Sequence, residues 1–330
     1  MKTTVIGAGA WGTALANLLA ENGHEALLWA FEPDVVDSVN SHAENRRFLG
    51  GVPLHRSLRA TSSLQTACDG AQLIIYASPS HVLRQVAAQA ARWVPEQIPL
   101  VVATKGIERE HLALMTDVVA QESPGRPVVA LSGPSFAQEV ANHLPTAIVA
   151  ASADAQAAKL TQDTLSTAGF RVYTQRDVIG VEIGGALKNV MAVATGISDG
   201  LQLGFNARAA LITRGLAEMT RLGVKLGAEP ATFAGLAGLG DLVLTCTGSL
   251  SRNRSVGIEI GRGATLSEVL QGRDTVAEGV TTTESARALA EKHDVDMPIV
   301  RAVHRVLFEK QPARWALVEL MTRDLRDEND

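Results

Sequence analysis

Short apolar runs alternate with longer stretches of helical spacing through the first half of the chain. The runs are rich in Val, Ile and Leu and are bounded by Gly, Pro or Ser, which predicts buried strands. This alternation is typical of βαβ units with a parallel sheet. The predicted strands are residues 3–7, 25–30, 73–78, 100–104, 128–132, 146–150 and 171–173, and the predicted helices between them are 11–21, 34–40, 82–92, 112–121 and 154–167.

The pattern changes after Gln175, where strand-like runs stop and helical spacing continues. No repeat of fixed period and no low-complexity linker marks the change, so we expect two abutting domains with a cleft between them. The predicted fold is an α/β domain with a parallel sheet over residues 1–176, followed by an all-helical domain over residues 177–330. Helices of the second domain are predicted at 181–197, 207–226, 266–270, 283–292 and 298–309.

Composition narrows the class of protein without identifying a function. A chain of 330 residues with 46% apolar and 20% charged residues is long enough for two folded cores. The formal charge of −5 gives no broad positive field, which disfavours nucleic acid and anionic membrane surfaces as partners. Cys68 and Cys246 lie in no metal-ligand or paired pattern, so we expect no metal site and a reducing, cytoplasmic location. No signal-peptide pattern is present and no apolar run reaches the roughly 18 residues of a membrane span, so no integral membrane segment is expected.

A glycine-rich turn, GAGAWG, follows the first predicted strand and opens the first predicted helix. Gly7 permits the tight turn, Gly9 lets the backbone approach a pyrophosphate, and Gly12 lets helix and strand pack closely. The helix N-terminus presents unpaired N–H groups to the phosphates. A lone motif of this kind is weak, but here strand, turn, helix and second strand follow in register. We therefore expect residues 1–176 to be a Rossmann-like domain that binds a dinucleotide.

The end of the second predicted strand bears on the choice between NAD and NADP. Glu32 lies about twenty residues past Gly12, where a carboxylate accepts hydrogen bonds from the ribose and repels a 2′-phosphate, which favours NADH. In the alternative interpretation Glu32, which precedes Pro33, only caps the next helix. Arg46 and Arg47 could each bind a 2′-phosphate, so the sequence leaves NAD or NADP open.

Two lysines stand out as candidates for catalysis. Lys105 follows a predicted strand at the carboxyl edge of the sheet, where open parallel sheets bind ligands. In the alternative interpretation it is an ordinary surface lysine at the end of a strand. Lys188 lies in an apolar, glycine-lined helix, where burial and a second lysine would lower its pKa and allow proton exchange near neutral pH. Its alternative interpretation is a helical lysine that faces solvent.

Three further segments carry hydrogen-bonding side chains in suggestive patterns. Ser135 and Gln138 fit a capping box, so helix capping alone could explain Ser135. Asp241 and Thr245 share one face if their segment is helical, and both could then bind one small ligand. Residues 251–253, Ser-Arg-Asn, suit a phosphate monoester, although the same tripeptide is an ordinary loop in most sequences.

Taken together, seven segments in this order resemble the bacterial NAD(P)-dependent glycerol-3-phosphate dehydrogenases. The resemblance covers nearly the whole chain and is far more specific than any one motif. The matching segments are GAGAWGTALA, TKGIE, LSGPSFAQEV, IGVEIGGALKNVMAVATGISDG, NARAALITRGLAEM, GLGDLVLTCTGSLSRNR and VAEGVTTT.

The resemblance implies reversible reduction of dihydroxyacetone phosphate to sn-glycerol 3-phosphate, in glycerophospholipid synthesis, by a cytoplasmic homodimer. It implies that Lys188 is the proton donor and acceptor and that Lys105 contacts substrate and cofactor, with Asp241 and Thr245 completing the catalytic set. The remaining implied substrate contacts are Gly133, Ser135, Asn189, Ser251, Arg252 and Asn253, and the remaining implied cofactor contacts are Ala10, Trp11, Phe31, Ala137, Arg252, Val276 and Glu278.

One departure from the family pattern affects the cofactor. Where many members carry a His-Arg-type pair, this chain has Phe31 and Glu32, which puts NADPH preference in doubt and supports NADH. Two other functions stay open: a two-domain 2-keto or β-hydroxy acid reductase with a catalytic lysine, and a nicotinamide sensor without turnover. A phosphate clamp at 251–253 argues against the first, and a pair of cleft lysines argues against the second.

Overall fold

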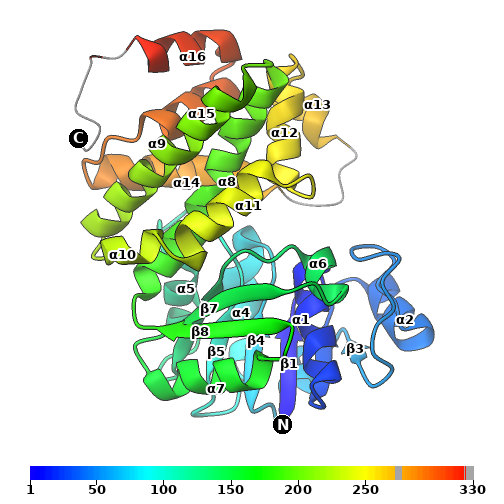
Figure 1. Cartoon of the computed structure of the whole chain (residues 1–330). Helices are drawn as coiled ribbons and strands as arrows, with labels where there is room; N and C mark the ends of the chain where they lie inside the picture. Colours follow the sequence, from blue (N-terminus) through cyan, green and yellow to red (C-terminus); the bar gives the residue numbers. More distant parts are fainter. Residues whose placement is uncertain (272–276, 323, 325–330) are drawn as a thin grey trace.

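A computed structural model describes residues 1–271, 277–322 and 324, and shows an α/β part below a helical part (Figure 1). Eight strands form one sheet in the order β3-β2-β1-β4-β5-β6-β7-β8. The chain starts in the middle of this sheet and crosses from one half to the other between β1 and β4, the place where such sheets bind ligands. The strands are β1 Lys2–Ile6, β2 Glu25–Trp29, β3 Arg59–Thr61, β4 Leu73–Tyr76, β5 Leu100–Val102, β6 Val128–Ser132, β7 Thr146–Ala151 and β8 Phe170–Gln175.

Helices cover both faces of the sheet, as the near-continuous apolar strands require. One face packs against α1 Ala10–Glu21, α2 Pro33–His42, α6 Ala137–Ala141 and α7 Ala155–Leu165. The opposite face packs against α3 Leu64–Cys68, α4 Leu83–Ala91 and α5 Met115–Glu122, with the short 3-10 turn η1 Ser80–Val82 before α4.

The second part is helical throughout its described residues. Its centre is α8 Val178–Gly200, which is buried along almost its whole length and enters the helical part directly from β8. The other helices pack around α8 and form a separate apolar core. They are α9 Gly204–Lys225, α10 Pro230–Phe233, the π-helix η2 Leu236–Gly240, α11 Asp241–Thr247, α12 Arg252–Gly261, α13 Leu266–Leu270, α14 Glu278–Lys292, α15 Pro298–Phe308 and α16 Ala313–Met321.

The predicted fold class is confirmed, although several elements of the first part differ from the prediction, among them β3 and α3, which were not predicted. Strand β7 runs antiparallel to β6, because only the short helix α6 separates them and a hairpin-like return needs no crossover. The helix predicted at 112–121 begins later, at Met115, because Leu112 has a left-handed φ of 55° and Leu114 pairs with Ile107. We propose the change of architecture between β8 and α8 as the domain boundary, next to the division predicted after residue 176.

Within the part of the chain that the structure describes, two helical segments are long and apolar enough to cross a membrane by length and composition. The first is α8, of whose apolar window 89% is buried inside the protein. The second, Pro230–Thr247, runs through α10, η2 and α11 and is half-buried. Core helices pass this test, and the burial of α8 by its neighbours explains its apolar sequence.

Candidate active site

The glycine-rich turn joins β1 to α1 beside the end of β4. Gly7 has a φ of 118°, and a Cβ atom on Gly12 would lie 1.8 Å from the carbonyl oxygen of Gly7. Gly9 is different, because nothing lies within 4 Å of the position that its Cβ would take. The first helical turn therefore has open space in front of it, and no side chain caps its N–H groups. This geometry fits a pyrophosphate at the N-terminus of α1.

Two side chains next to the turn strengthen that fit. The indole Nε1 of Trp11 is buried and has no hydrogen-bond partner among the described residues, so a donor is available for a ligand. Asn45 was not predicted as a site residue, but its side chain hydrogen-bonds to the glycine-rich turn and to α1. Its amide donates to the carbonyl of Ala8 and to the hydroxyl of Thr13, both at 2.8 Å. A buried asparagine far from the motif in sequence gave no signal of this role.

Alanine at Gly9 and alanine at Gly12 are expected to have different effects. Gly9→Ala meets no atom in the free protein and keeps an ordinary φ of −62°, so we expect unchanged stability but about 100-fold weaker cofactor binding, since the methyl group occupies the pyrophosphate position. Gly12→Ala forces the turn apart and should lower the free energy of unfolding by about 3 kcal/mol. Calorimetry and nicotinamide fluorescence titration measure both quantities. Equal cofactor affinity in Gly9→Ala and wild type would contradict the pyrophosphate site.

The ribose end of the predicted cofactor site lies where β2 passes into α2. Glu32 occupies the N-cap position of α2, but its side chain makes no capping hydrogen bond, so the capping interpretation of this carboxylate is wrong. Its carboxylate is half-buried and free to accept from a ribose, while Phe31 beside it is exposed. Arg46 is held by Glu44 at 3.2 Å, and Arg47 lies 3.4 Å from Asp34. Both arginines thus already have carboxylate partners.

Across the sheet edge, Lys105, Lys188 and Asp241 form one buried cluster. The Nζ atom of Lys188 lies 2.5 Å from Oδ1 of Asp241 and 3.1 Å from the hydroxyl of Thr245. The Nζ atom of Lys105 lies 2.7 Å from Oδ2 of the same carboxylate and 3.2 Å from the carbonyl of Gly133. The alternative surface interpretations of both lysines are therefore wrong. The predicted shared face of Asp241 and Thr245 is confirmed, because α11 places them one turn apart and both are buried.

Burial and charge act in opposite directions on this cluster. Burial lowers the pKa of Lys188 to about 7, and the positive charge of Lys105 adds to that effect, while Asp241 opposes it. Burial by itself would raise the pKa of the Asp241 carboxyl, but the two ammonium groups hold it below its usual value. The cluster thus keeps a carboxylate charged and brings a lysine into the range where it can give or take a proton near neutral pH.

Close contact between α8 and α12 brings the 251–253 segment to the lysine helix. A Cβ on Gly196 would lie 2.2 Å from the carbonyl of Arg254, and one on Gly257 would lie 2.2 Å from the carbonyl of Val193, so only glycines allow this approach. As a result the amide of Asn253 donates to Oδ1 of Asn189 at 2.8 Å. The structure thereby joins Asn253 to the residue that follows Lys188.

The other two members of this segment have different surroundings. Ser251 is the N-cap of α12 and accepts a hydrogen bond from the backbone N–H of Arg254, so its hydroxyl has a structural task. Arg252 is exposed at the same helix start, and among the described residues its guanidinium has no hydrogen-bond partner. Although Arg252 is exposed, the protein around it partly desolvates its guanidinium and lowers the pKa of Arg252, while the negative charge of Glu278 opposes that shift. Arg252 is therefore free to bind an anion.

Glu278 connects the two parts of the chain. Its carboxylate accepts from the backbone N–H of Ser80 at 3.0 Å and from the hydroxyl of Ser80 at 2.5 Å. Ser80 follows β4 and was not predicted as a site residue. Its position beside the switch point places Glu278 at the edge of the cofactor region. Val276, also a predicted cofactor contact, lies outside the described residues.

The predicted site residues after β6 lie along a turn that faces the cluster. Gly133 has a φ of 139° and offers its carbonyl to both Lys105 and the hydroxyl of Ser135. The capping-box interpretation of Ser135 is wrong, because Phe136 is the N-cap of α6 and no side chain caps that helix. Ala137 begins α6, which packs against α1 near the glycine-rich turn.

Comparisons with known proteins agree over the whole chain. A model of the NAD-dependent glycerol-3-phosphate dehydrogenase N-terminus matches residues 2–158, and one of the C-terminus of the same family matches residues 177–318. A glycerol-3-phosphate dehydrogenase [NAD(P)+] from Geobacter sp. (strain M21) is 53% identical over 330 residues, covering 99% of this chain and 98% of that protein. A crystal structure of glycerol-3-phosphate dehydrogenase from Coxiella burnetii has a TM-score of 0.94 and 42% identity, covering 98% of this chain and 99% of that one. A ketopantoate reductase from Ralstonia eutropha shares the fold alone, with a TM-score of 0.61 and 14% identity over 97% of this chain and 100% of that one.

Proposed function

We propose the following site and mechanism from the premise that the chain belongs to the NAD-dependent glycerol-3-phosphate dehydrogenases. It is an oxidoreductase that interconverts dihydroxyacetone phosphate and glycerol 3-phosphate with NAD or NADP. The observation that supports the assignment of its active site is the pair of lysines bound to the single buried carboxylate of Asp241.

Lys188 is the proton donor in this proposal. As an ammonium, Lys188 stabilises the negative charge that builds on the ketone oxygen and then donates its proton to it. In the reverse direction its neutral amine accepts the proton of the alcohol. Asp241 and Thr245 fix the position of Nζ of Lys188, and Lys105 contributes a second positive charge next to the reacting oxygen.

The cofactor is expected to lie across the ends of β1 and β4. The open N-terminus of α1 and the unpaired indole of Trp11 fit its pyrophosphate, and Glu32 fits its ribose. Ala10, Phe31, Ala137 and Glu278 surround this region. When bound, the reduced nicotinamide supplies a hydride to the substrate carbon. The chain itself orients the groups, excludes water and moves the proton.

The substrate phosphate is expected at the start of α12. Arg252 is exposed there without a hydrogen-bond partner among the described residues, and Asn253 is positioned by Asn189. A guanidinium suits a phosphate dianion, and binding energy from this non-reacting group can position the carbonyl. Ser251 supports the site by capping α12, because its hydroxyl accepts a hydrogen bond from the backbone N–H of Arg254. Ser135 and Gly133 lie on the opposite side, beside Lys105.

The two alternatives have less support. A reductase of a simple keto acid has no use for a phosphate-binding site at the start of α12. The solved ketopantoate reductase shares only the fold with this chain. A sensor without turnover has no need of a buried lysine whose pKa burial lowers to about 7.

We also propose that the enzyme is a homodimer in a reducing, cytoplasmic compartment and that it provides glycerol phosphate for glycerophospholipids. Exposed apolar side chains on the helical part, Phe205, Trp315 and Met321, support an interface there. Both cysteines are free thiols, which is consistent with a reducing location. Sedimentation equilibrium measures the oligomeric state directly.

The activity is tested by following the loss of reduced nicotinamide absorbance with purified protein and dihydroxyacetone phosphate. NADH and NADPH are compared in parallel, and unphosphorylated dihydroxyacetone is the control. We expect oxidation that depends on the phosphate group. Cofactor binding without oxidation of either cofactor would contradict the proposed function and favour the sensor.

The two reaction directions should respond oppositely to pH. Because ketone reduction needs Lys188 as an ammonium, kcat/KM for reduction should fall as pH rises through about 7, the pKa to which burial lowers this lysine. Oxidation needs the neutral amine, so its kcat/KM should rise over the same range. Cofactor affinity measured at each pH is the control. Parallel profiles in both directions would exclude Lys188 as the exchanging group.

Removal of the Glu32 carboxylate should change cofactor preference. In Glu32→Ser the repulsion of a 2′-phosphate is lost together with the ribose hydrogen bonds, so the ratio of kcat/KM for NADPH to that for NADH should rise by about 30-fold, the factor for a charged hydrogen bond of roughly 2 kcal/mol. Glu25→Gln, at the exposed start of β2, the strand that leads to Glu32, is the matched control. An unchanged ratio in Glu32→Ser would exclude Glu32 as the determinant.

A further inference from the structure

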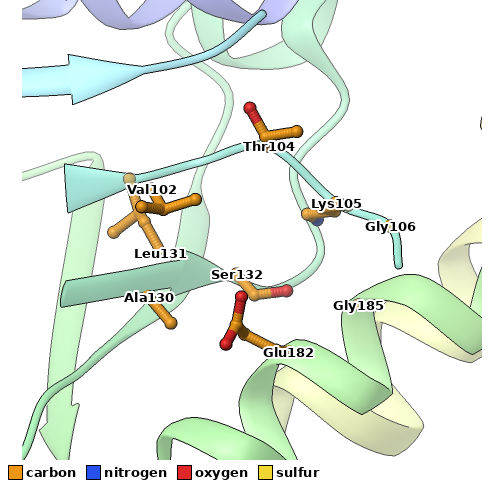
Figure 2. Close-up of a pocket in the computed structure, with 9 residues that line it drawn as sticks. All are labelled: Val102, Thr104, Lys105, Gly106, Ala130, Leu131, Ser132, Glu182 and Gly185. Atoms are coloured by element: carbon orange, nitrogen blue, oxygen red, sulfur yellow. The ribbon is translucent and has the colours of Figure 1, made fainter. Parts of the chain in front are cut away.

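A small cavity lies between the two parts of the chain, beside the Lys105 segment (Figure 2). The end of β5, strand β6 and helix α8 all contribute to its wall. Its volume is about 10 Å3, close to what a single water molecule requires. The polar side chains that line it include Ser132 and Glu182, which lie next to each other in the figure.

The hydroxyl of Ser132 is the first sign that this cavity has an occupant. Ser132 is only 5% exposed, and its Oγ has no hydrogen-bond partner among the described residues. Gly185 leaves the space in front of it open, since a Cβ there would lie 2.6 Å from Oγ. A buried hydroxyl without a partner is costly, and ordered water is the usual solution.

Glu182 provides the second polar wall. It is 8% exposed and accepts two hydrogen bonds from Thr116, one from the backbone N–H at 2.9 Å and one from the hydroxyl. In this way a residue of the helical part caps α5 of the sheet part, whose own N-cap residue Leu114 has no side-chain hydrogen bond. Burial raises the pKa of Glu182 to about 7 and neighbouring Asp117 adds to the shift, while the bonds from Thr116 oppose it. Among the described residues no cation pairs with Glu182.

We propose that this cavity binds one structural water that joins Glu182 and Ser132 to the Lys105 segment, and that Glu182 is a positioning residue for Lys105. The inference rests on the proposed function for its kinetic part only. The lining offers a water at least two polar partners, the Ser132 hydroxyl and the Glu182 carboxylate, and the Lys105 segment forms a third side of the cavity. Helix α8 carries Glu182, then Gly185 about one turn later and Lys188 about two turns later, and a Cβ on Gly185 would lie 3.6 Å from the side chain of Lys105, so this helix packs against one lysine and carries the other.

The consequence for activity follows from what Lys105 contacts. Its ammonium shares the Asp241 carboxylate with Lys188, so a small displacement of the Lys105 segment changes the position of charge in front of the substrate. Because Lys188 keeps its own bonds to Asp241 and Thr245, loss of the water link should weaken binding of dihydroxyacetone phosphate at Lys105 more than it slows the proton transfer by Lys188. We expect KM to rise about fivefold in either Ser132→Ala or Glu182→Gln, the factor for one ordinary hydrogen bond, with kcat nearly unchanged.

The test combines a crystal structure with a double-mutant cycle. A high-resolution crystal of the wild type should show one water in the cavity, and a crystal of Ser132→Ala should show it displaced or absent. Because both side chains act through the same water, the double variant should raise KM no further than either single variant. Glu218→Gln is the matched control, since Glu218 is also a buried cap, accepting from the N–H of Ile299 at the start of α15, but lies away from the cluster.

Each arm has an outcome that overturns the proposal. An empty cavity in the wild-type crystal overturns the water site. An unchanged KM in both single variants, additive effects in the double variant, or an equal rise in Glu218→Gln overturns the positioning role. Ser132→Ala removes one oxygen and keeps the cap on α5, so the test survives if Glu182→Gln folds poorly. Absence of activity in the wild type would contradict the proposed function and leave the crystal test of the water intact.

Discussion

Replacing Lys188 by alanine is expected to lower kcat for reduction of dihydroxyacetone phosphate by roughly 10³-fold, within the range that general acids contribute. Within the cluster, only the ammonium of Lys188 is bound by both the Asp241 carboxylate, at 2.5 Å, and the Thr245 hydroxyl, at 3.1 Å. Burial lowers its pKa to about 7. Without it, Lys105 still supplies charge, but among the described residues no other ammonium is held by both Asp241 and Thr245 in a position to donate the proton. Turnover should fall in both reaction directions.

Cofactor binding distinguishes a chemical from a structural effect of this substitution. The glycine-rich turn lies in the other part of the chain, so the dissociation constant for NADH should stay within about threefold of the wild type. Lys225→Ala removes an exposed lysine at the end of α9 and is the matched control. Near-normal turnover in a folded Lys188→Ala variant would exclude the proposed proton donor.

Replacing Asp241 by asparagine is expected to produce the second large effect, a decrease in reductive kcat of about 10²-fold. The change keeps the shape of the side chain but removes the charge that both ammonium groups share. Since that charge opposes the effect of burial, its loss should lower the pKa of Lys188 further, so less of the lysine is an ammonium at neutral pH. The loss should therefore be greater for reduction than for oxidation.

The pH profile measures this directly. In Asp241→Asn the fall of reductive kcat/KM should move to lower pH than in the wild type. Asp177→Asn is the matched control, because Asp177 caps α8, the helix that carries Lys188, through the N–H of Gly180 and touches neither lysine. Loss of stability alone would affect the two variants alike. An unshifted profile in Asp241→Asn would show that the carboxylate does not control the proton affinity of Lys188.

The local patterns of the sequence were sufficient to predict most of the strands of the first part. Short continuous apolar runs predicted the positions of β1, β2, β4, β5, β6, β7 and β8, since a strand buried on both faces needs apolar residues along its length. The short strand β3 was missed, because three residues, of which only Ala60 is buried, carry too little pattern. The antiparallel direction of β7 was also missed, because strand direction depends on pairing with a neighbour rather than on the strand's own residues.

The sequence by itself determined which residues we propose for the chemistry: the glycine-rich turn, the two lysines and Asp241 with Thr245. These are signals of residue type and short spacing. Only the tertiary structure decided that Lys105 and Lys188 share one carboxylate, because Asp241 lies far from both in sequence and is brought there by packing of α11 on α8. The same holds for Ser251, which the structure uses as a helix cap, and for Asn45, Ser80 and Glu182, whose partners lie in distant segments. Spacing along a chain fixes what is near on one helix or strand, whereas contacts between elements depend on how their surfaces pack, and that is set by the whole core.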